Sequence, residues 1–167
     1  MSRLVSHVPL RLPLWDELPT ESLRMKQLLE ITNQYVEPII DDTLTQTMMH
    51  NYFKADVLPA PVGKFYEQKD VAGAIVVDLL KNNFSLNEIK YALHWVLREF
   101  SPKEGYDNFV NMFNEQAKQE PFSPKSLTSI DLKSATEVTK MQYAGLHSIL
   151  YWYYSKKMLE KDWKKKK

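Results

Sequence analysis

The chain has 167 residues, a formal net charge of +1 and no cysteine. Its length suits one domain with an ordinary core, or one small domain with an appendage. The lack of cysteine excludes disulfides, thiolate metal sites and thiol-based redox sensing, and the near-zero charge gives no overall attraction to nucleic acid. No apolar run approaches the roughly 20 residues of a transmembrane helix, and residues 1–9 lack the apolar core of a signal peptide. We therefore expect a cytoplasmic protein that does not enter a membrane.

The N-terminal part predicts an extended arm followed by a helix. Residues 1–19 contain several prolines and scattered apolar side chains. The apolar side chains expected to pack against the body are Leu12, Leu14 and Trp15. From Ser22 to about Val36 apolar residues recur at helical spacing, and Pro38 is predicted to end this helix because proline lacks the N–H that a helix needs. We interpret it as a helix that supports the helix after it.

The predicted reading helix begins after Thr45. Thr45 is a suitable N-cap, and Met48 and Tyr52 lie four residues apart, so both are expected to face the core. The other side chains are polar or basic, and such groups reach base edges and phosphates in a DNA major groove. The predicted DNA-binding residues of this helix are Gln46, Thr47, His50, Asn51 and Lys54. A solvated polar face on an ordinary surface helix explains the same pattern.

A turn and a small hairpin are predicted next. Asp56 tolerates the left-handed backbone that ends many helices, and Pro59 and Pro61 prevent the helix from resuming. The stretch from Leu58 to Tyr66 is expected to form a short β-hairpin, the wing of the motif. Lys64 lies where a wing meets a DNA phosphate, so it completes the set of predicted DNA-binding residues.

Two helices are predicted after the wing. Residues 71–80 are apolar nearly all round, which indicates the buried helix of the domain. Ser85 and Glu88 have the spacing of a capping box, and apolar residues follow on one face of the next helix. A short helix, a proline turn, a hairpin and two helices form the order of a winged helix-turn-helix.

This stretch resembles the DNA-binding domain of the MerR family. The matching residues are Tyr52, then Asp56-Val57-Leu58-Pro59, then Lys64-Phe65-Tyr66, then Asn83-Phe84-Ser85-Leu86-Asn87-Glu88-Ile89. His50 and Lys64 stand where that family usually carries arginine, and Asp56 and Asn83 replace glycines. The two basic replacements weaken phosphate binding, because lysine lacks the arginine fork and histidine is mostly neutral at pH 7. The resemblance implies a winged helix-turn-helix that binds double-stranded DNA.

A closer resemblance extends from about Leu12 to Leu93. The residues that carry it are Leu12-Pro13-Leu14-Trp15-Asp16-Glu17-Leu18-Pro19, Asn51-Tyr52, Leu58-Pro59 with Pro61, and Phe84-Ser85-Leu86 with Glu88-Ile89. They are similar to a bacterial family named domain of unknown function 1836. That name implies no activity, so it supports the architecture and a bacterial origin rather than a function.

The charges of the predicted reading domain argue against strong DNA binding. From Leu44 to Leu93 there are five lysines and five acidic residues, so the formal charge is zero. The lysines are Lys54, Lys64, Lys69, Lys81 and Lys90, and the acids are Asp56, Glu67, Asp70, Asp78 and Glu88. DNA affinity depends largely on neutralising phosphates. The DNA hypothesis therefore requires that the lysines cluster on one side while the acids face away.

The C-terminal part is predicted to be helical. Ser101 and Glu104 form another capping box, with Pro102 at the first helical position. One long helix is expected from about Ser129 to Glu160, because two apolar stripes run along it. The stripes are Val138, Met141, Gly145, Ile149 and Trp152, and Ala135, Tyr143, Leu146, Leu150 and Tyr153. Two stripes predict burial in the domain core and against a second copy of the chain, although one wide buried face in a monomer fits the same pattern.

Two further features occupy the C-terminal part. The aromatic cluster from Tyr151 to Tyr154 would suit a small-molecule effector, but nothing in the sequence identifies one, and such rings are more typical of a core or an interface. Lys164 to Lys167 form a basic end that is typical of a solvated terminus and that would also attract phosphates.

We divide the chain into an arm (1–19), a winged helix-turn-helix domain (20–100), a helical dimerisation or effector region (101–160) and a basic tail (161–167).

The predicted fold is mainly helical, with the hairpin wing and a long C-terminal helix. The sequence contains no glycine-rich phosphate loop, no G-x-S-x-G and no H-E-x-x-H, and its four histidines lack the spacing of metal ligands. We therefore expect no enzymatic activity, no cofactor and no metal. The favoured hypothesis is a dimeric DNA-binding transcriptional regulator. The alternative, which the neutral charge favours, is a helical protein-interaction module that keeps the helix-turn-helix shape.

Overall fold

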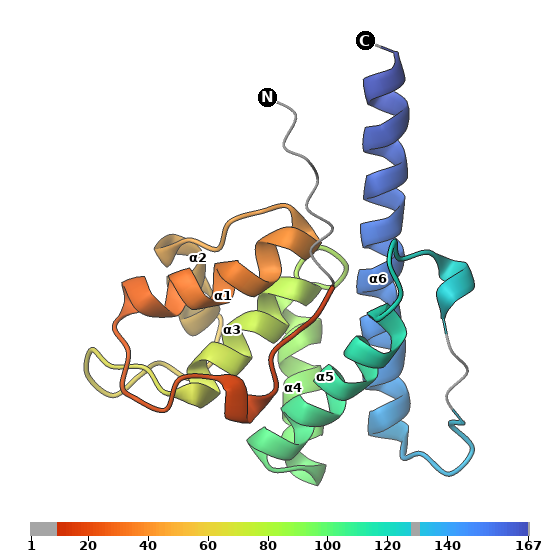
Figure 1. Ribbon diagram of the computed structural model, residues 1–167. Coiled ribbons are helices and arrows are strands. Elements are labelled where there is room, and N and C mark those ends of the chain that lie inside the picture. Colours follow the sequence, from red (N-terminus) through yellow and green to blue (C-terminus); the bar gives the residue numbers. More distant parts are fainter. Residues whose placement is uncertain (1–9, 128–130, 167) are drawn as a thin grey trace.

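The computed structural model describes residues 10–127 and 131–166, which are all-helical and contain no β-strand. The elements are η1 (Trp15–Glu17), α1 (Met25–Ile40), α2 (Gln46–Lys54), α3 (Gln68–Leu80), α4 (Leu86–Glu99), α5 (Pro102–Ala117), η2 (Pro124–Ser126) and α6 (Glu137–Lys165). Helix α1 packs across α3, and α5 packs against α6 (Figure 1). The C-terminal part of α6 extends beyond the other helices. The prediction of a mainly helical fold is confirmed.

Helix α3 lies at the centre of the core, as its apolar sequence predicts. Val71, Ile75 and Leu79 are almost completely buried. Gly73 allows the close approach of the loop that follows α2, because a Cβ at this position would lie 2.7 Å from the side chain of Leu58. The predicted capping box at Ser85 is complete, because the Ser85 hydroxyl accepts the Glu88 N–H and the Glu88 carboxylate accepts the Ser85 N–H. At Ser101 the hydroxyl caps α5 by accepting the Glu104 N–H, and it also donates to the Glu104 carboxylate.

The predicted β-hairpin between Leu58 and Tyr66 is wrong. In the described residues Tyr66 makes an isolated antiparallel bridge with Leu23, just before α1, through N–H···O distances of 2.7 and 2.8 Å. The reason is that Pro59 and Pro61 remove two N–H donors from the first arm of the expected hairpin. The segment after α2 is therefore a loop that is fastened to the start of α1.

The predicted bounds of the first helix are also wrong. Helix α1 begins at Met25 and includes Pro38 in its last turn. The carbonyl that loses its partner belongs to Gln34, which is exposed to water. The helix continues because Ile39 and Ile40 are buried in the core, and it ends at Asp41, whose φ is 53°.

Helix α6 begins at Glu137 and not near Ser129. Thr136 caps it by accepting the N–H of Thr139 at 3.3 Å, and residues 128–130 lie outside the described part of the chain. Four of the ten stripe residues, Val138, Leu146, Ile149 and Leu150, are buried in the monomer. Trp152 and Tyr153 are partly buried against the same core. The helix continues through the basic residues to Lys165.

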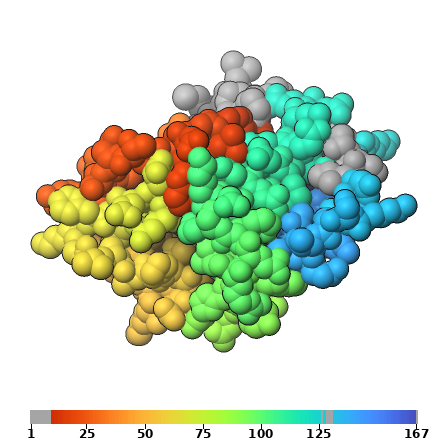
Figure 2. Space-filling view, turned by 90° about the horizontal axis from the view of Figure 1, so that it is seen from below, coloured from red at the N-terminus to blue at the C-terminus, as the bar shows by residue number. Residues whose placement is uncertain are grey.

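The N-terminal arm is pinned to α5, a contact that periodicity does not reveal. The Leu12 backbone N–H donates to Asn114 Oδ1 at 2.8 Å, and Asn114 Nδ2 donates to the Leu12 carbonyl at 3.0 Å. Tyr106 donates its hydroxyl to the Pro13 carbonyl at 2.7 Å. Figure 2 shows the arm (red) against the green residues of α5. Leu12 is fully buried, as predicted, whereas Leu14 and Trp15 are half-buried.

Candidate nucleic-acid interface

Helix α2 carries the predicted DNA-binding side chains on a solvent-exposed face. Thr45 Oγ1 accepts the Met48 N–H at 3.3 Å, so the predicted N-cap is confirmed. Met49 and Tyr52 are buried, while Met48 is half-buried, so Met49 fills the core position predicted for Met48. The exposed predicted residues are Gln46, Thr47, His50, Asn51 and Lys54 on the helix and Lys64 in the loop.

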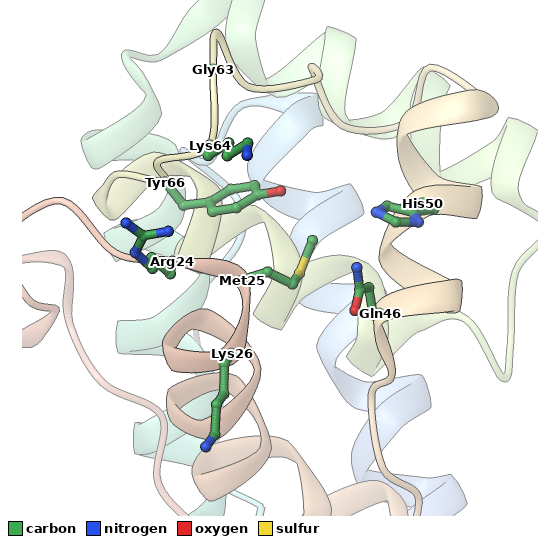
Figure 3. Close-up of a pocket in the computed structure, with 8 residues that line it drawn as sticks. All are labelled: Arg24, Met25, Lys26, Gln46, His50, Gly63, Lys64 and Tyr66. Carbon is green, nitrogen blue, oxygen red and sulfur yellow. The ribbon is translucent and has the colours of Figure 1, made fainter.

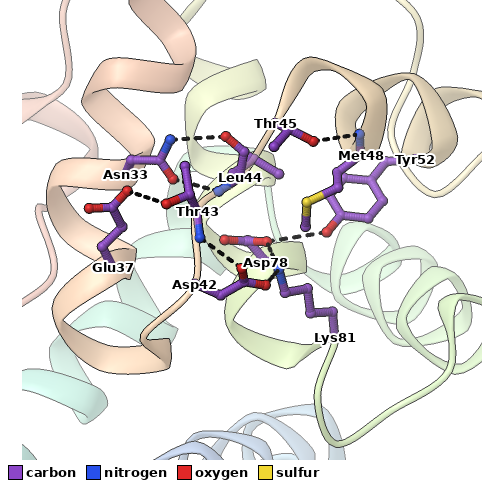
Figure 4. A network of polar contacts seen from close by, with 10 residues as sticks. All are labelled: Asn33, Glu37, Asp42, Thr43, Leu44, Thr45, Met48, Tyr52, Asp78 and Lys81. Atoms are coloured by element: carbon purple, nitrogen blue, oxygen red, sulfur yellow. Dashed lines mark hydrogen bonds and ion pairs between the residues drawn. The ribbon is translucent and has the colours of Figure 1, made fainter.

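A buried polar network sets the orientation of α2. The side chain of Asp78 on α3 is completely buried and accepts the Tyr52 hydroxyl of α2 at 3.2 Å. Lys81 lies 2.9 Å from Asp78 and 2.8 Å from Asp42, which follows α1 (Figure 4). The network therefore joins α3 to α2 and to the turn between α1 and α2.

Burial governs the protonation of this network. Burial raises the pKa of Asp78 despite the opposing effects of Lys81 and Tyr52. Burial, together with the negative charge of Asp78, also raises the pKa of the Tyr52 hydroxyl well above its ordinary value. The hydroxyl is therefore a permanent donor to Asp78 in the physiological range. Asn33 of α1 accepts the Leu44 N–H at 2.8 Å and donates to the Leu44 carbonyl at 3.0 Å. These two bonds fix the backbone that leads into α2.

A shallow groove separates α2 from the start of α1 and from the loop after α2. It has a volume of about 340 Å³, and its lining residues are Arg24, Met25, Lys26, Gln46, His50, Gly63, Lys64 and Tyr66. Figure 3 shows Gln46 and His50 on one wall, Arg24 and Lys64 on the other, and Met25 and Tyr66 between them. The structure thus brings three predicted site residues together with two cationic residues, Arg24 and Lys26, that the sequence analysis did not include.

No local signal in the sequence identifies Arg24 or Lys26 as part of this surface. They belong to the segment that the sequence predicts as the support of the reading helix. They reach the groove because Leu23 pairs with Tyr66. The remaining predicted residues, Thr47, Asn51 and Lys54, lie on the polar face of α2 but do not line the groove.

Some cations of the domain have acidic partners and others have none. Within the described residues Arg24, Lys26, Lys54 and Lys64 form no ion pair, whereas Lys69, Lys81 and Lys90 each have an acidic partner. Of the five acids between Leu44 and Leu93, three pair with lysines and two accept backbone N–H groups. Their partners are Lys90 for Asp56, Lys81 for Asp78, Lys69 for Glu67, the Glu67 N–H for Asp70 and the Ser85 N–H for Glu88. Lys54 and Lys64 are therefore the unpaired cations inside this neutral stretch, and Arg24 and Lys26 add two more from outside it.

The other candidate features of the sequence lie away from this surface. In the described parts of the chain no three histidine, aspartate or glutamate side chains gather as metal ligands do, and no helix there is long and apolar enough to cross a membrane. In the aromatic cluster, Lys156 covers the Trp152 ring at 5.6 Å and Lys157 covers the Tyr153 ring at 5.5 Å. Phe122 also meets Tyr153 edge-on at 6.5 Å, so these rings make contacts within the monomer.

The fold and the groove define a helical protein in which a short exposed helix, α2, borders a groove with unpaired cations. The chain belongs to the family described as domain of unknown function (DUF1836), whose family model matches residues 13–117. The match covers the end of the arm, from residue 13, and all helices from α1 to the last residue of α5. No curated protein and no solved structure matches the chain.

Proposed function

We propose that this protein is a DNA-binding transcriptional regulator and that α2 is its reading helix. The observation that carries the proposal is the set of unpaired cations beside the exposed polar face of α2. Such cations contribute little to the stability of the fold, because each remains solvated and has no acidic partner. They supply the phosphate contacts on which DNA affinity depends.

The proposed binding mode places α2 in the major groove. Asn51 has the side chain that reads adenine through two hydrogen bonds, and Gln46 carries the same amide chemistry. Lys54 and Lys64 would contact phosphates, which position the protein without reading sequence. In this arrangement the loop from residue 58 to residue 66 acts as a MerR-like wing, although it has no hairpin.

We further propose that the protein acts as a homodimer through the projecting end of α6. Met158, Leu159 and Trp163 are 50%, 66% and 68% exposed, which is unusual for three large apolar side chains within six residues. The two predicted stripes do not carry this proposal, because they are largely used inside the monomer. Two copies would double a weak half-site contact. DNA binding of this kind would take place in the bacterial cytoplasm.

A second candidate function, a helical protein-interaction module, is favoured by the same exposed side chains of α6. Tyr91 and Leu97 on α4 are also 67% and 52% exposed. A partner protein that covers these surfaces would explain them without any DNA contact. Binding measurements separate the two functions.

The test is titration of purified protein with labelled duplex DNA of mixed sequence at several salt concentrations, followed by selection of preferred sequences. We expect binding in low salt that weakens linearly with the logarithm of salt concentration, and enrichment of a shared sequence motif. Salt-sensitive binding without enrichment would restrict the function to non-specific DNA contact. Absence of binding in low salt would remove the DNA function and favour the interaction module.

A further inference from the structure

We propose that Arg24, which precedes the first residue of α1, is a third DNA-contacting element and grips the phosphate backbone beside Lys64. This inference rests on the proposed DNA-binding function. The start of α1, which the sequence predicts only as part of a supporting helix, then also contacts DNA. The ligand is a backbone phosphate of duplex DNA.

The position of Arg24 is unfavourable for helix stability. It is the N-cap residue of α1, where serine, threonine, aspartate and asparagine are preferred. Its side chain makes no capping bond, and its own N–H is instead satisfied by Gln27 Oε1 at 2.9 Å. Lys26 adds a second cation in the first turn, which contains no acid. Both charges sit at the positive end of the helix dipole, where anions stabilise a helix and cations do not.

The same charges suit a bound phosphate. The positive end of a helix dipole and two nearby cations attract an anion to one place. Neither Arg24 nor Lys26 forms an ion pair in the described residues, so both charges are available to an anion. These cations weaken the isolated helix but favour a bound anion. Such residues are expected where binding rather than stability is selected.

Two contacts hold Arg24 on the wall of the groove. The Leu23–Tyr66 bridge fastens the adjacent backbone to the loop, and the Arg24 guanidinium lies 5.4 Å from the centre of the Phe65 ring. Phe65 is itself 51% exposed, so the ring contributes little to the core and is available to orient the arginine. The segment before α1 thus pairs with Tyr66 where the first strand of the expected hairpin would lie, and Figure 3 shows Arg24 and Lys64 on the same wall of the groove.

The chemistry of Arg24 complements that of Lys64. Among the described residues that line the groove, Arg24 is the one guanidinium. A guanidinium holds two phosphate oxygens in a fork, whereas the lysine ammonium acts as a point charge. Phe65 is therefore a positioning residue and Arg24 the contacting one.

The experiment measures binding of full-length variants to a fluorescent duplex of about two helical turns, over a series of salt concentrations. Arg24→Gln should weaken binding several-fold for all sequences and lower the salt slope by about one, as expected for one lost phosphate contact. Its thermal midpoint should not fall, because the substitution removes a cation from the positive end of a dipole. Arg98→Gln, which removes another exposed arginine, from α4, is the matched control and should leave binding unchanged.

Phe65→Leu provides the second measurement. It should weaken binding less than Arg24→Gln, and it should add nothing in the double variant, because the ring acts only through the arginine. Wild-type affinity and slope in Arg24→Gln, or equal losses in Arg98→Gln, would overturn the inference while leaving the DNA function intact. A fall in the thermal midpoint of Arg24→Gln with an unchanged salt slope would show a structural role instead. Absence of binding by the wild type would overturn both proposals.

Discussion

The buried pair between Asp78 and Lys81 allows a quantitative test of how α2 is held. Asp78 has no exposed side-chain surface and Lys81 is 13% exposed, with 2.9 Å between their charged atoms. Removing one partner of a buried pair typically costs about 3–5 kcal/mol, because the other charge is left without compensation. For Lys81→Met we expect the lower end, about 3 kcal/mol. The Tyr52 hydroxyl still donates to Asp78 at 3.2 Å, and a carboxyl whose pKa is already raised protonates more easily.

The assay is urea unfolding followed by circular dichroism at pH 7. In a thermal scan of the same variant, a loss of about 3 kcal/mol in the free energy of unfolding corresponds to a fall of about 6–12 °C in the midpoint of a domain of this size. The double variant Asp78→Asn with Lys81→Met should recover most of the loss, because it contains no uncompensated buried charge. Lys103→Met is the matched control. It breaks an exposed pair with Asp16 at 2.9 Å and should change the free energy of unfolding far less than Lys81→Met, because water screens an exposed pair.

Two outcomes would refute this reasoning. One is a loss below about 1 kcal/mol for Lys81→Met, which would equate the buried pair with an exposed one. The other is additive losses in the double variant, since residues in one network are expected to couple by about 0.5–3 kcal/mol. Because Tyr52 lies in α2, Lys81→Met should also weaken DNA binding at temperatures where the protein is folded.

Three further predictions concern DNA reading, assembly and pH. Asn51→Ala should lose about 1–3 kcal/mol of discrimination between preferred and mixed DNA sequences. Lys64→Ala should weaken binding to preferred and to mixed sequences equally. An equal loss of discrimination in the two variants would contradict the reading role of α2. Trp163→Glu should reduce a dimeric mass in light scattering to that of a monomer, and a wild type that is already monomeric would refute the α6 interface. Burial raises the pKa of Asp78 above its ordinary value of 3.8, so the folded state holds that proton more tightly. The stability advantage of wild type over Asp78→Asn should therefore be largest below pH 3.8 and fall as pH rises through the raised pKa; a pH-independent difference would contradict it.

Local chemistry in the sequence determined the starts of α2, α4 and α5 and the polar face of α2. Thr45, Ser85 and Ser101 each place a hydroxyl where the first turn has unpaired N–H groups. The run from residue 71 to residue 80 can only be buried, because it has no polar face of its own. Asp56 adopts the left-handed conformation with a φ of 57°, as a short polar side chain permits. Each of these features depends on residues within a few positions of one another, so periodicity and capping rules predict them.

Tertiary packing decided the features that depend on residues far apart in the chain. The two prolines after α2 disfavour a hairpin, but only the fold supplies Leu23 as the partner of Tyr66. Burial of Ile39 and Ile40 carries α1 past a proline that local rules treat as a stop. The same bridge brings Arg24 to the groove, and ion pairing elsewhere leaves its cations unpaired. A sum of charges along the sequence cannot distinguish a lysine that faces aspartate from one that faces water, because that difference arises only when the helices pack.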